Sequence, residues 1–353
     1  MNFCYKFPVV KGLQAGKEYY IAMVPLKMIS ALFPNDEEYV LPEHRAQRKL
    51  NEARIPEIKR YMLENRDSYV FSALAASIDG KYKYVPSEQE DLGILEVSMD
   101  AHFLINDGQH RKAAILAAVD EDPSIGDETI SVVFYEDQGL TRSQQMFTDL
   151  NKHAVKTSNS IAELYDSRDE LAVHTRAIVN AVPFFDEYVD KEKDILGKFS
   201  SSLFTLNNLY MANKRILKRN PCDDVFEDFC IKYWTLVAEH MVPWREMQER
   251  TISKTELREK YIAAQAVVLL ALGRVGGFLF ENISGEEIDK YLAGLESIDW
   301  KRNHSDWQQR VIKPNGRMIN NEKAIILAAN LIKKKIGLPL SPDEEETEKE
   351  ISR

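Results

Sequence analysis

The stretch HFLINDGQHRKAAILAAV, residues 102–119, places five polar or flexible residues between a short apolar run and an alanine-rich run. The apolar run at 101–106 has the length and composition of a strand. The alanine-rich residues at 111–119 are typical of a helix. The pentad DGQHR at 107–111 is therefore predicted to form a strand-to-helix turn.

The segments around this turn predict a mixed α+β unit over residues 1–156. Further strands are expected at 18–26, 68–79, 92–100 and 130–137, which are apolar or alternating runs bounded by turn residues. A helix is expected over 45–65, where Pro56 favours a helix start. Thr141 and Gln144 form a capping-box pattern that predicts another helix.

The rest of the chain has helical periodicity, which predicts an α-helical domain over 157–340 and an acidic, mobile tail over 341–353. Helices are expected within 158–182, 202–219, 223–244, 255–280, 284–299 and 320–337. The most apolar segment, 267–280, predicts a buried central helix that ends at a glycine turn. Gly273, Gly276 and Gly277 would also allow another helix to approach closely.

Composition excludes several classes of protein. The formal net charge of -10 argues against a coat of positive charge that binds nucleic acid indiscriminately, although it leaves room for a local basic face. No segment approaches the length of a membrane helix, so the protein is expected to be cytoplasmic. The three cysteines show no metal-ligand spacing and are expected to be free thiols, and no metal site is predicted.

The pentad has two interpretations from residue types alone. Gly108 permits a tight turn, and the amides that open the following helix favour an anion, with His110 and Arg111 as donors suited to phosphate. The alternative is an ordinary polar turn in which Asp107 caps the helix. Asn151 and Lys152, after the next predicted helix, are either a second group of donors or a simple helix end.

Two groups of basic residues are candidate DNA contacts, and both could equally be ordinary solvated or core features. The first group follows one helix face, with Asn207, Asn208 and Asn213 nearby for base edges, and consists of Lys214, Arg215, Lys218 and Arg219. The second group is interleaved with Trp300 and Trp307, which could stack on bases or lie in the core, and consists of Lys301, Arg302, Arg310 and Lys313.

The segment INDGQHRKAAI resembles the signature of DGQHR-domain proteins, a branch of the group that includes ParB and sulfiredoxin. Within that branch the chain is similar to the DndB family of regulators of DNA phosphorothioate (sulfur) modification gene clusters. The resemblance extends to QRKLNEARIPEIKRYMLENRDSYVFSAL, MFTDLNKHAVK, SSLFTLNNLYMA and the end pattern from 298 to 338.

This resemblance implies a ParB/sulfiredoxin-like core and a DNA-binding negative transcriptional regulator whose partner is double-stranded promoter DNA. It also implies that the turn holds a phosphate or nucleotide, in a pocket formed by Asp107, Gly108, Gln109, His110, Arg111, Asn151 and Lys152. Two alternatives stay open. One is a nucleotide-hydrolysing or DNA-nicking enzyme centred on the pentad, and the other is an interaction subunit of the sulfur-modification proteins. A homo-oligomer is also left open.

Overall fold

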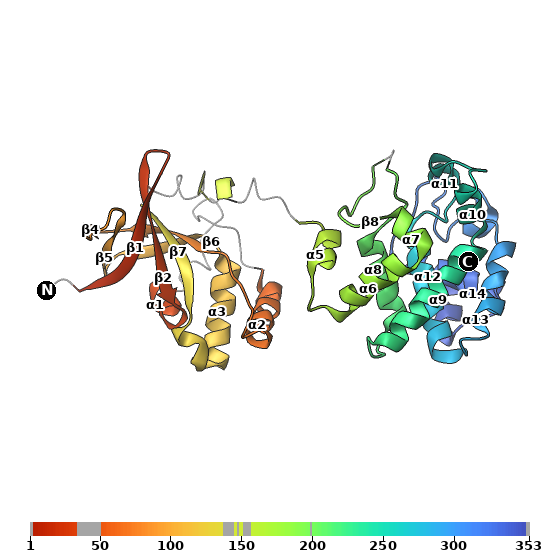
Figure 1. Cartoon of the computed structure of the whole chain (residues 1–353), viewed down its shortest axis with the longest axis horizontal. Helices are drawn as coiled ribbons and strands as arrows, with labels where there is room; N and C mark the ends of the chain where they lie inside the picture. The colour runs from red at the N-terminus through yellow and green to blue at the C-terminus, as the bar shows by residue number, and fades with distance from the viewer. Residues whose placement is uncertain are drawn as a thin grey trace. The chain divides into compact units, whose positions relative to one another are not determined.

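The computed structural model describes residues 3–33, 51–136, 145–146, 148–150, 157–197 and 200–350. The chain divides into two compact units, Met1–Val155 and Lys156–Arg353, and each is described by itself. Figure 1 shows a sheet with flanking helices in the first unit and mostly helices in the second. The predicted α+β fold class is confirmed at this level.

The first unit contains a seven-stranded mixed sheet with the order β4-β5-β1-β2-β7-β3-β6. Neighbouring strands are antiparallel except for β3 and β7, which are parallel. The strands are β1 (Cys4–Gln14), β2 (Lys17–Pro25), β3 (Leu74–Asp79), β4 (Tyr82–Pro86), β5 (Leu92–Ser98), β6 (His102–Asp107) and β7 (Thr129–Glu136).

Helices of the first unit pack against this sheet through a shared apolar core. In β2 the side chains of Tyr20, Ala22 and Val24 alternate into that core, as expected for a strand with one buried face. Ile115 and Ala118 contribute from the helical side, and α2 and α3 lie side by side (Figure 1). The helical elements are η1 (Leu26–Met28), α1 (Ile29–Leu32), η3 (Glu52–Arg54), α2 (Ile55–Glu64), α3 (Gln109–Glu121) and η4 (Pro123–Asp127).

Several sequence-based boundaries in this unit are corrected. The strand expected over 68–79 begins only at Leu74, and the helix expected over 45–65 is an α-helix from Ile55, with residues 45–50 outside the described part of the chain. Strands β1 and β4 were not predicted, because β1 contains Pro8 and Gly12 and β4 has only five residues. The capping-box pattern of Thr141 and Gln144 also lies outside the described residues.

The described residues of the second unit are largely helical and include a parallel pair of two-residue strands. Its elements are α5 (Asn159–Tyr165), α6 (Glu170–Ala181), α7 (Pro183–Tyr188), β8 (Val189–Asp190), β9 (Phe204–Thr205), α8 (Leu206–Leu217), α9 (Asp224–His240), α10 (Val242–Gln248), α11 (Lys254–Lys260), α12 (Ala266–Asn282), α13 (Ile288–Leu292), η5 (Ala293–Ser297), η6 (Ser305–Trp307), α14 (Glu322–Lys335) and α15 (Pro342–Lys349).

Helix α12 is the buried centre of this unit and packs against α8 and α14. The predicted close approach is confirmed, because a Cβ on Gly273 would lie 2.5 Å from the carbonyl oxygen of Ala212 in α8. The predicted glycine turn is wrong, since α12 continues through Gly276 and Gly277 to Asn282. The part of the chain that the structure describes contains no helix long and apolar enough to cross a membrane.

The acidic end of the chain differs from the mobile tail expected from sequence. Residues 342–349 form helix α15, whose N-terminus has a capping box between Ser341 and Glu344. Glu344 is buried against α14, where its carboxylate pairs with Lys333. The sequence alone predicts solvated charge for this segment, whereas the structure holds it on the helical unit through ion pairs with α14.

Candidate functional site

The pentad forms the predicted turn between β6 and α3. Gly108 is the N-cap of α3 and has a φ of 99°, a left-handed conformation that L-residues rarely adopt. A Cβ at this position would lie 2.4 Å from Cδ2 of Leu74, which is fully buried at the start of β3. Both the backbone conformation and the packing therefore require glycine here.

Asp107 and Arg111 form an ion pair across this turn. Nη2 of Arg111 donates to Oδ2 of Asp107 at 2.7 Å, and Nη1 of Arg111 donates to the hydroxyl of Ser72. Among the described residues, no side chain caps the first turn of α3. The alternative interpretation of Asp107 as a helix cap is therefore wrong, because its carboxylate faces Arg111 one helical turn ahead.

His110 connects the first turn of α3 to another segment of the first unit. Its Nε2 accepts a hydrogen bond of 3.1 Å from the backbone N–H of Asn51. This nitrogen acts as an acceptor in that contact. The contact links the start of η3 to the first turn of α3, where Gln109 is half-buried.

Asn106 is a residue at this site that sequence reasoning missed. Its side chain is fully buried and its Nδ2 donates to Oγ of Ser77 at 2.6 Å, while its Oδ1 has no hydrogen-bond partner among the described residues. The ladder between β3 and β6 shifts register here, since Ala75 pairs with Asp107 and Ala76 with Ile105. The available signal was an amide in an otherwise apolar strand, next to the pentad.

The arrangement can present backbone N–H groups to an anion. The first turn of the 13-residue helix α3 carries the positive end of the helix dipole, and no side chain in the described part of the chain caps it. Nε of Arg111 is buried without a partner in the described part of the chain, while its other nitrogens contact Asp107 and Ser72. An anion entering this turn would have to compete with the carboxylate of Asp107 for the guanidinium.

The other predicted pocket residues, Asn151 and Lys152, lie outside the described residues. In the described ranges, no group of three or more His, Cys, Asp or Glu side chains is placed so that it could hold a metal ion.

The basic residues at the end of α8 and directly after it differ in whether they form ion pairs with other described residues. Lys214 and Arg219 are exposed and form no ion pair among the residues that the structure describes. Arg215 instead pairs with Glu322 at 2.8 Å, and Lys218 pairs with Glu281 at 2.6 Å. The paired side chains are less available to phosphate than the sequence pattern implied.

The asparagines of α8 do not form a row for base edges. Asn213 is fully buried, where it donates to Thr175 and accepts from the indole N–H of Trp234 at 2.8 Å. Asn208 completes the capping box of α8 with Thr205. Both therefore have structural roles that correct the prediction, while Asn207 is half-buried in the first turn.

In the second basic group, Arg310 forms an ion pair within the helical unit. It forms a bidentate pair with Glu348 at 2.5 and 2.8 Å, so it is not a free cation for phosphate. Trp300 and Trp307 are buried and stacked on each other, with ring centroids 5.5 Å apart, which identifies them as core residues.

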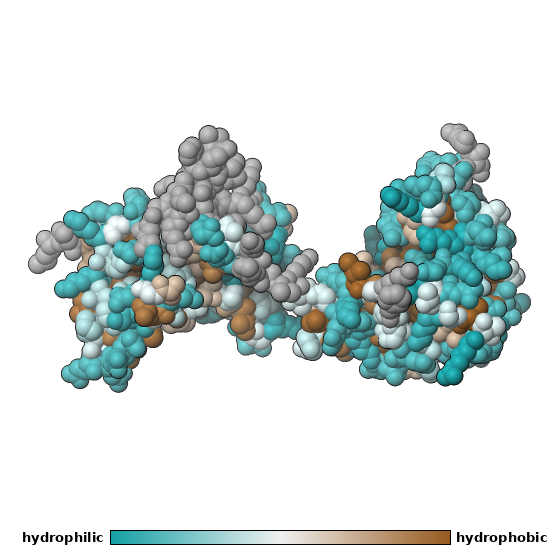
Figure 2. All heavy atoms as spheres, turned by 90° about the horizontal axis from the view of Figure 1, so that it is seen from above, coloured by the Kyte–Doolittle hydropathy of each residue, from teal (hydrophilic) through white to brown (hydrophobic). Residues whose placement is uncertain are grey.

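The other cations of this group remain near the surface. Lys301 and Lys313 are exposed and form no ion pair within the described ranges, while Arg302 donates to the carbonyl of Gly316 at 2.9 Å. Lys301 and Arg302 line a cavity of about 670 Å³. Its lining also includes Tyr261, Asn303 and Gln308. Figure 2 shows the visible face of the helical unit as largely hydrophilic, with small, separate hydrophobic patches.

The fold and this turn define a class of protein in which an α+β unit with a glycine-capped polar turn precedes a helical unit. Residues 7–339 match the family DndB, described as DNA-sulfur modification-associated. The chain therefore belongs to the DndB family. Comparisons with curated proteins and with solved structures give no match.

Proposed function

We propose that this protein is a DNA-binding negative transcriptional regulator of a DNA phosphorothioate-modification gene cluster, acting in the cytoplasm on double-stranded promoter DNA. The observation that carries the proposal is the family match over residues 7–339, which associates the chain with DNA sulfur modification. The regulatory role and the contact with DNA are the parts that need an experiment.

Exposed cations of the helical unit support a DNA-binding role. Lys214 and Arg219 lie near the end of α8, and Lys301 and Lys313 lie in the segment before α14. Each of them can neutralise a phosphate without first breaking an ion pair to another described residue. Most contacts of this kind position a protein on DNA, and they make its affinity dependent on salt.

A regulatory ligand at the pentad is a further part of the proposal. We infer a ParB/sulfiredoxin-type core whose turn holds a phosphate or nucleotide, with Asn151 and Lys152 nearby. The left-handed Gly108 supports this inference, as does the first turn of α3, which no described side chain caps. Binding of the anion would replace Asp107 as the partner of Arg111.

The test is a titration of promoter DNA at several salt concentrations. Two double variants, Lys214→Ala/Arg219→Ala and Lys301→Ala/Lys313→Ala, each remove two candidate contacts. Loss of two phosphate contacts should reduce the slope of log affinity against log salt by about 1.8.

A matched control is Lys232→Ala/Lys290→Ala, which removes the same charge from exposed lysines of the same unit. A salt-insensitive wild-type complex, or no complex at all, would refute the proposed function. Hydrolysis of a nucleotide that Arg111→Ala abolishes would favour an enzyme instead. Capture of the sulfur-modification proteins in the absence of DNA would favour an interaction subunit.

A further inference from the structure

Helix α15 is attached to the helical unit mainly by charged side chains. Its sequence is PDEEETEK, and Glu344 is its one buried residue. A helix that packs by apolar contact would bury several aliphatic side chains on one face. Docking of α15 therefore depends on the ion pairs that its carboxylates make.

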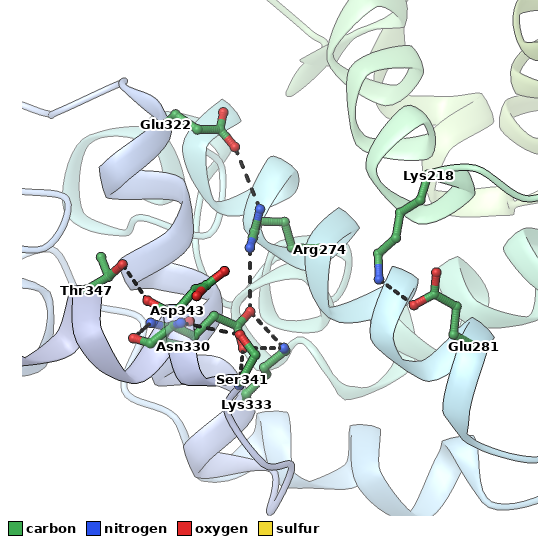
Figure 3. Close-up of polar contacts among 10 residues, drawn as sticks. Lys218, Arg274, Glu281, Glu322, Asn330, Lys333, Ser341, Asp343 and Thr347 are labelled. Atoms are coloured by element: carbon green, nitrogen blue, oxygen red, sulfur yellow. Dashed lines mark hydrogen bonds and ion pairs between the residues drawn. The ribbon is translucent and has the colours of Figure 1, made fainter.

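Three glutamates of this terminal segment pair with five basic side chains, which we call the covered basic surface. Glu344 contacts both Lys333 at 2.8 Å and Arg274 at 3.5 Å. Figure 3 shows Lys333 and Arg274 in this cluster of polar contacts. The covered basic surface consists of Arg274, Arg310, Lys323, Lys333 and Lys334, whose partners are Glu344, Glu348 and Glu350.

The centre of this contact has the geometry that arginine also uses for phosphate. Arg310 holds both oxygens of Glu348 in a bidentate pair, and only 16% of the Arg310 side chain and 11% of the Glu348 side chain are exposed. Lys334 adds a second cation to Glu348 at 2.8 Å. A planar guanidinium binds carboxylate and phosphate through the same fork of N–H donors, so a DNA backbone can replace the glutamate.

The covered basic surface and the glutamates that pair with it differ in whether they lie within the residues that match the family. All five basic residues lie within the matched residues 7–339, whereas Glu344, Glu348 and Glu350 lie beyond them. The cations thus belong to the segment that carries the family likeness, and the carboxylates that neutralise them do not.

We propose that α15 is an autoinhibitory cover that competes with the phosphates of duplex DNA for the covered basic surface. This inference rests on the proposed DNA-binding function. When α15 is docked, its carboxylates neutralise the cations. When DNA displaces it, Arg310, Lys323 and Lys334 become phosphate contacts and the acidic helix is released into solvent.

The test compares two double variants with the same change in charge. Glu348→Gln/Glu350→Gln removes the partners of Arg310, Lys334 and Lys323. The control, Glu345→Gln/Glu346→Gln, changes exposed residues of the same helix that form no ion pair among the described residues.

The first measurement is the salt concentration at which each full-length variant elutes from immobilised heparin, a polyanion. Glu348→Gln/Glu350→Gln should elute at higher salt than the control, because its cations are uncovered. Equal elution of the two variants overturns the cover, and this result does not depend on whether the protein recognises promoter DNA.

The second measurement is the affinity for promoter DNA at one fixed salt concentration. Glu348→Gln/Glu350→Gln binds without first breaking the ion pairs that these glutamates make with Arg310, Lys323 and Lys334, so it should have a lower Kd than the control. Equal Kd values overturn the cover while the proposed function stands. If the wild type binds no promoter DNA, the proposed function fails and the heparin result still decides whether the surface is covered.

A third measurement uses the unaltered protein and guards against variants that fold poorly. Saturating duplex DNA should raise amide hydrogen exchange in residues 342–350 of the wild type, because DNA displaces α15. Undiminished protection of that helix in the DNA complex overturns the proposal.

Discussion

Replacement of Gly108 by alanine should destabilise the first unit at the pentad. The backbone there has a φ of 99°, and an added Cβ would lie 2.4 Å from Cδ2 of the buried Leu74. A left-handed conformation costs an L-residue about 1–2 kcal/mol. Overpacking adds about 1–3 kcal/mol, so we expect a total cost of about 2–5 kcal/mol.

Gly16 provides a matched control for this substitution. It also has a positive φ, 75°, in the turn between β1 and β2, but an added Cβ there would meet no atom within 4 Å. Gly16→Ala therefore carries the backbone cost of about 1–2 kcal/mol without the clash. The difference between the two variants isolates the packing of Gly108 against Leu74.

Hydrogen exchange of β6 and α3 peptides measures the effect directly. A loss of about 2 kcal/mol or more corresponds to exchange that is about 30-fold faster or more, provided that these amides exchange by opening of the unit. Tryptophan fluorescence serves as an internal reference, because all four tryptophans lie in the helical unit. If Gly108→Ala exchanges no faster than Gly16→Ala, the packing argument is wrong.

Two further predictions concern the helical unit. Arg310 and Lys334 outweigh the opposing effect of burial and lower the pKa of Glu348 from 4.5 to about 2. Ionised Glu348 therefore contributes its full stabilisation of α15 docking above pH 4.5, and this contribution is lost as the pH falls through about 2. A carbon-13 titration of the Glu348 carboxyl with a midpoint near 4.5 would contradict this prediction. Asn213→Ala should leave the buried indole N–H of Trp234 without its acceptor and cost about 1–3 kcal/mol. The urea midpoint, followed by tryptophan fluorescence, measures that loss. Asn207→Ala is the control, and an equal loss of stability in this variant would show that burial of the Asn213 amide is not the cause.

The pentad was predictable as a turn because its signals are local. A polar segment with glycine between a strand pattern and a helix pattern has few other conformations, and the structure has Gly108 at the helix N-cap. The partners of the pentad were not predictable. Ser72 and Asn51 reach Arg111 and His110 from segments 39 and 59 residues away. No spacing rule links residues at such distances along the chain.

The basic face of α8 shows the same limit. Helical spacing placed Lys214, Arg215 and Lys218 near one another, but it could not distinguish free cations from paired ones. Glu322 lies 107 residues from Arg215 and Glu281 lies 63 residues from Lys218. An asparagine in a helix likewise gives no sign of whether it faces solvent or, like Asn213, a buried indole.

The sequence by itself determined the change from strand to helical periodicity, the strand-to-helix turn of the pentad and the buried apolar helix α12, because hydrophobic period and glycine position act over a few residues. The tertiary structure alone decided the strand order, the contact of Arg111 with Ser72, and the docking of the acidic helix α15. Those features depend on contacts between segments that are distant along the chain, such as the ion pair between Arg310 and Glu348, which are 38 residues apart.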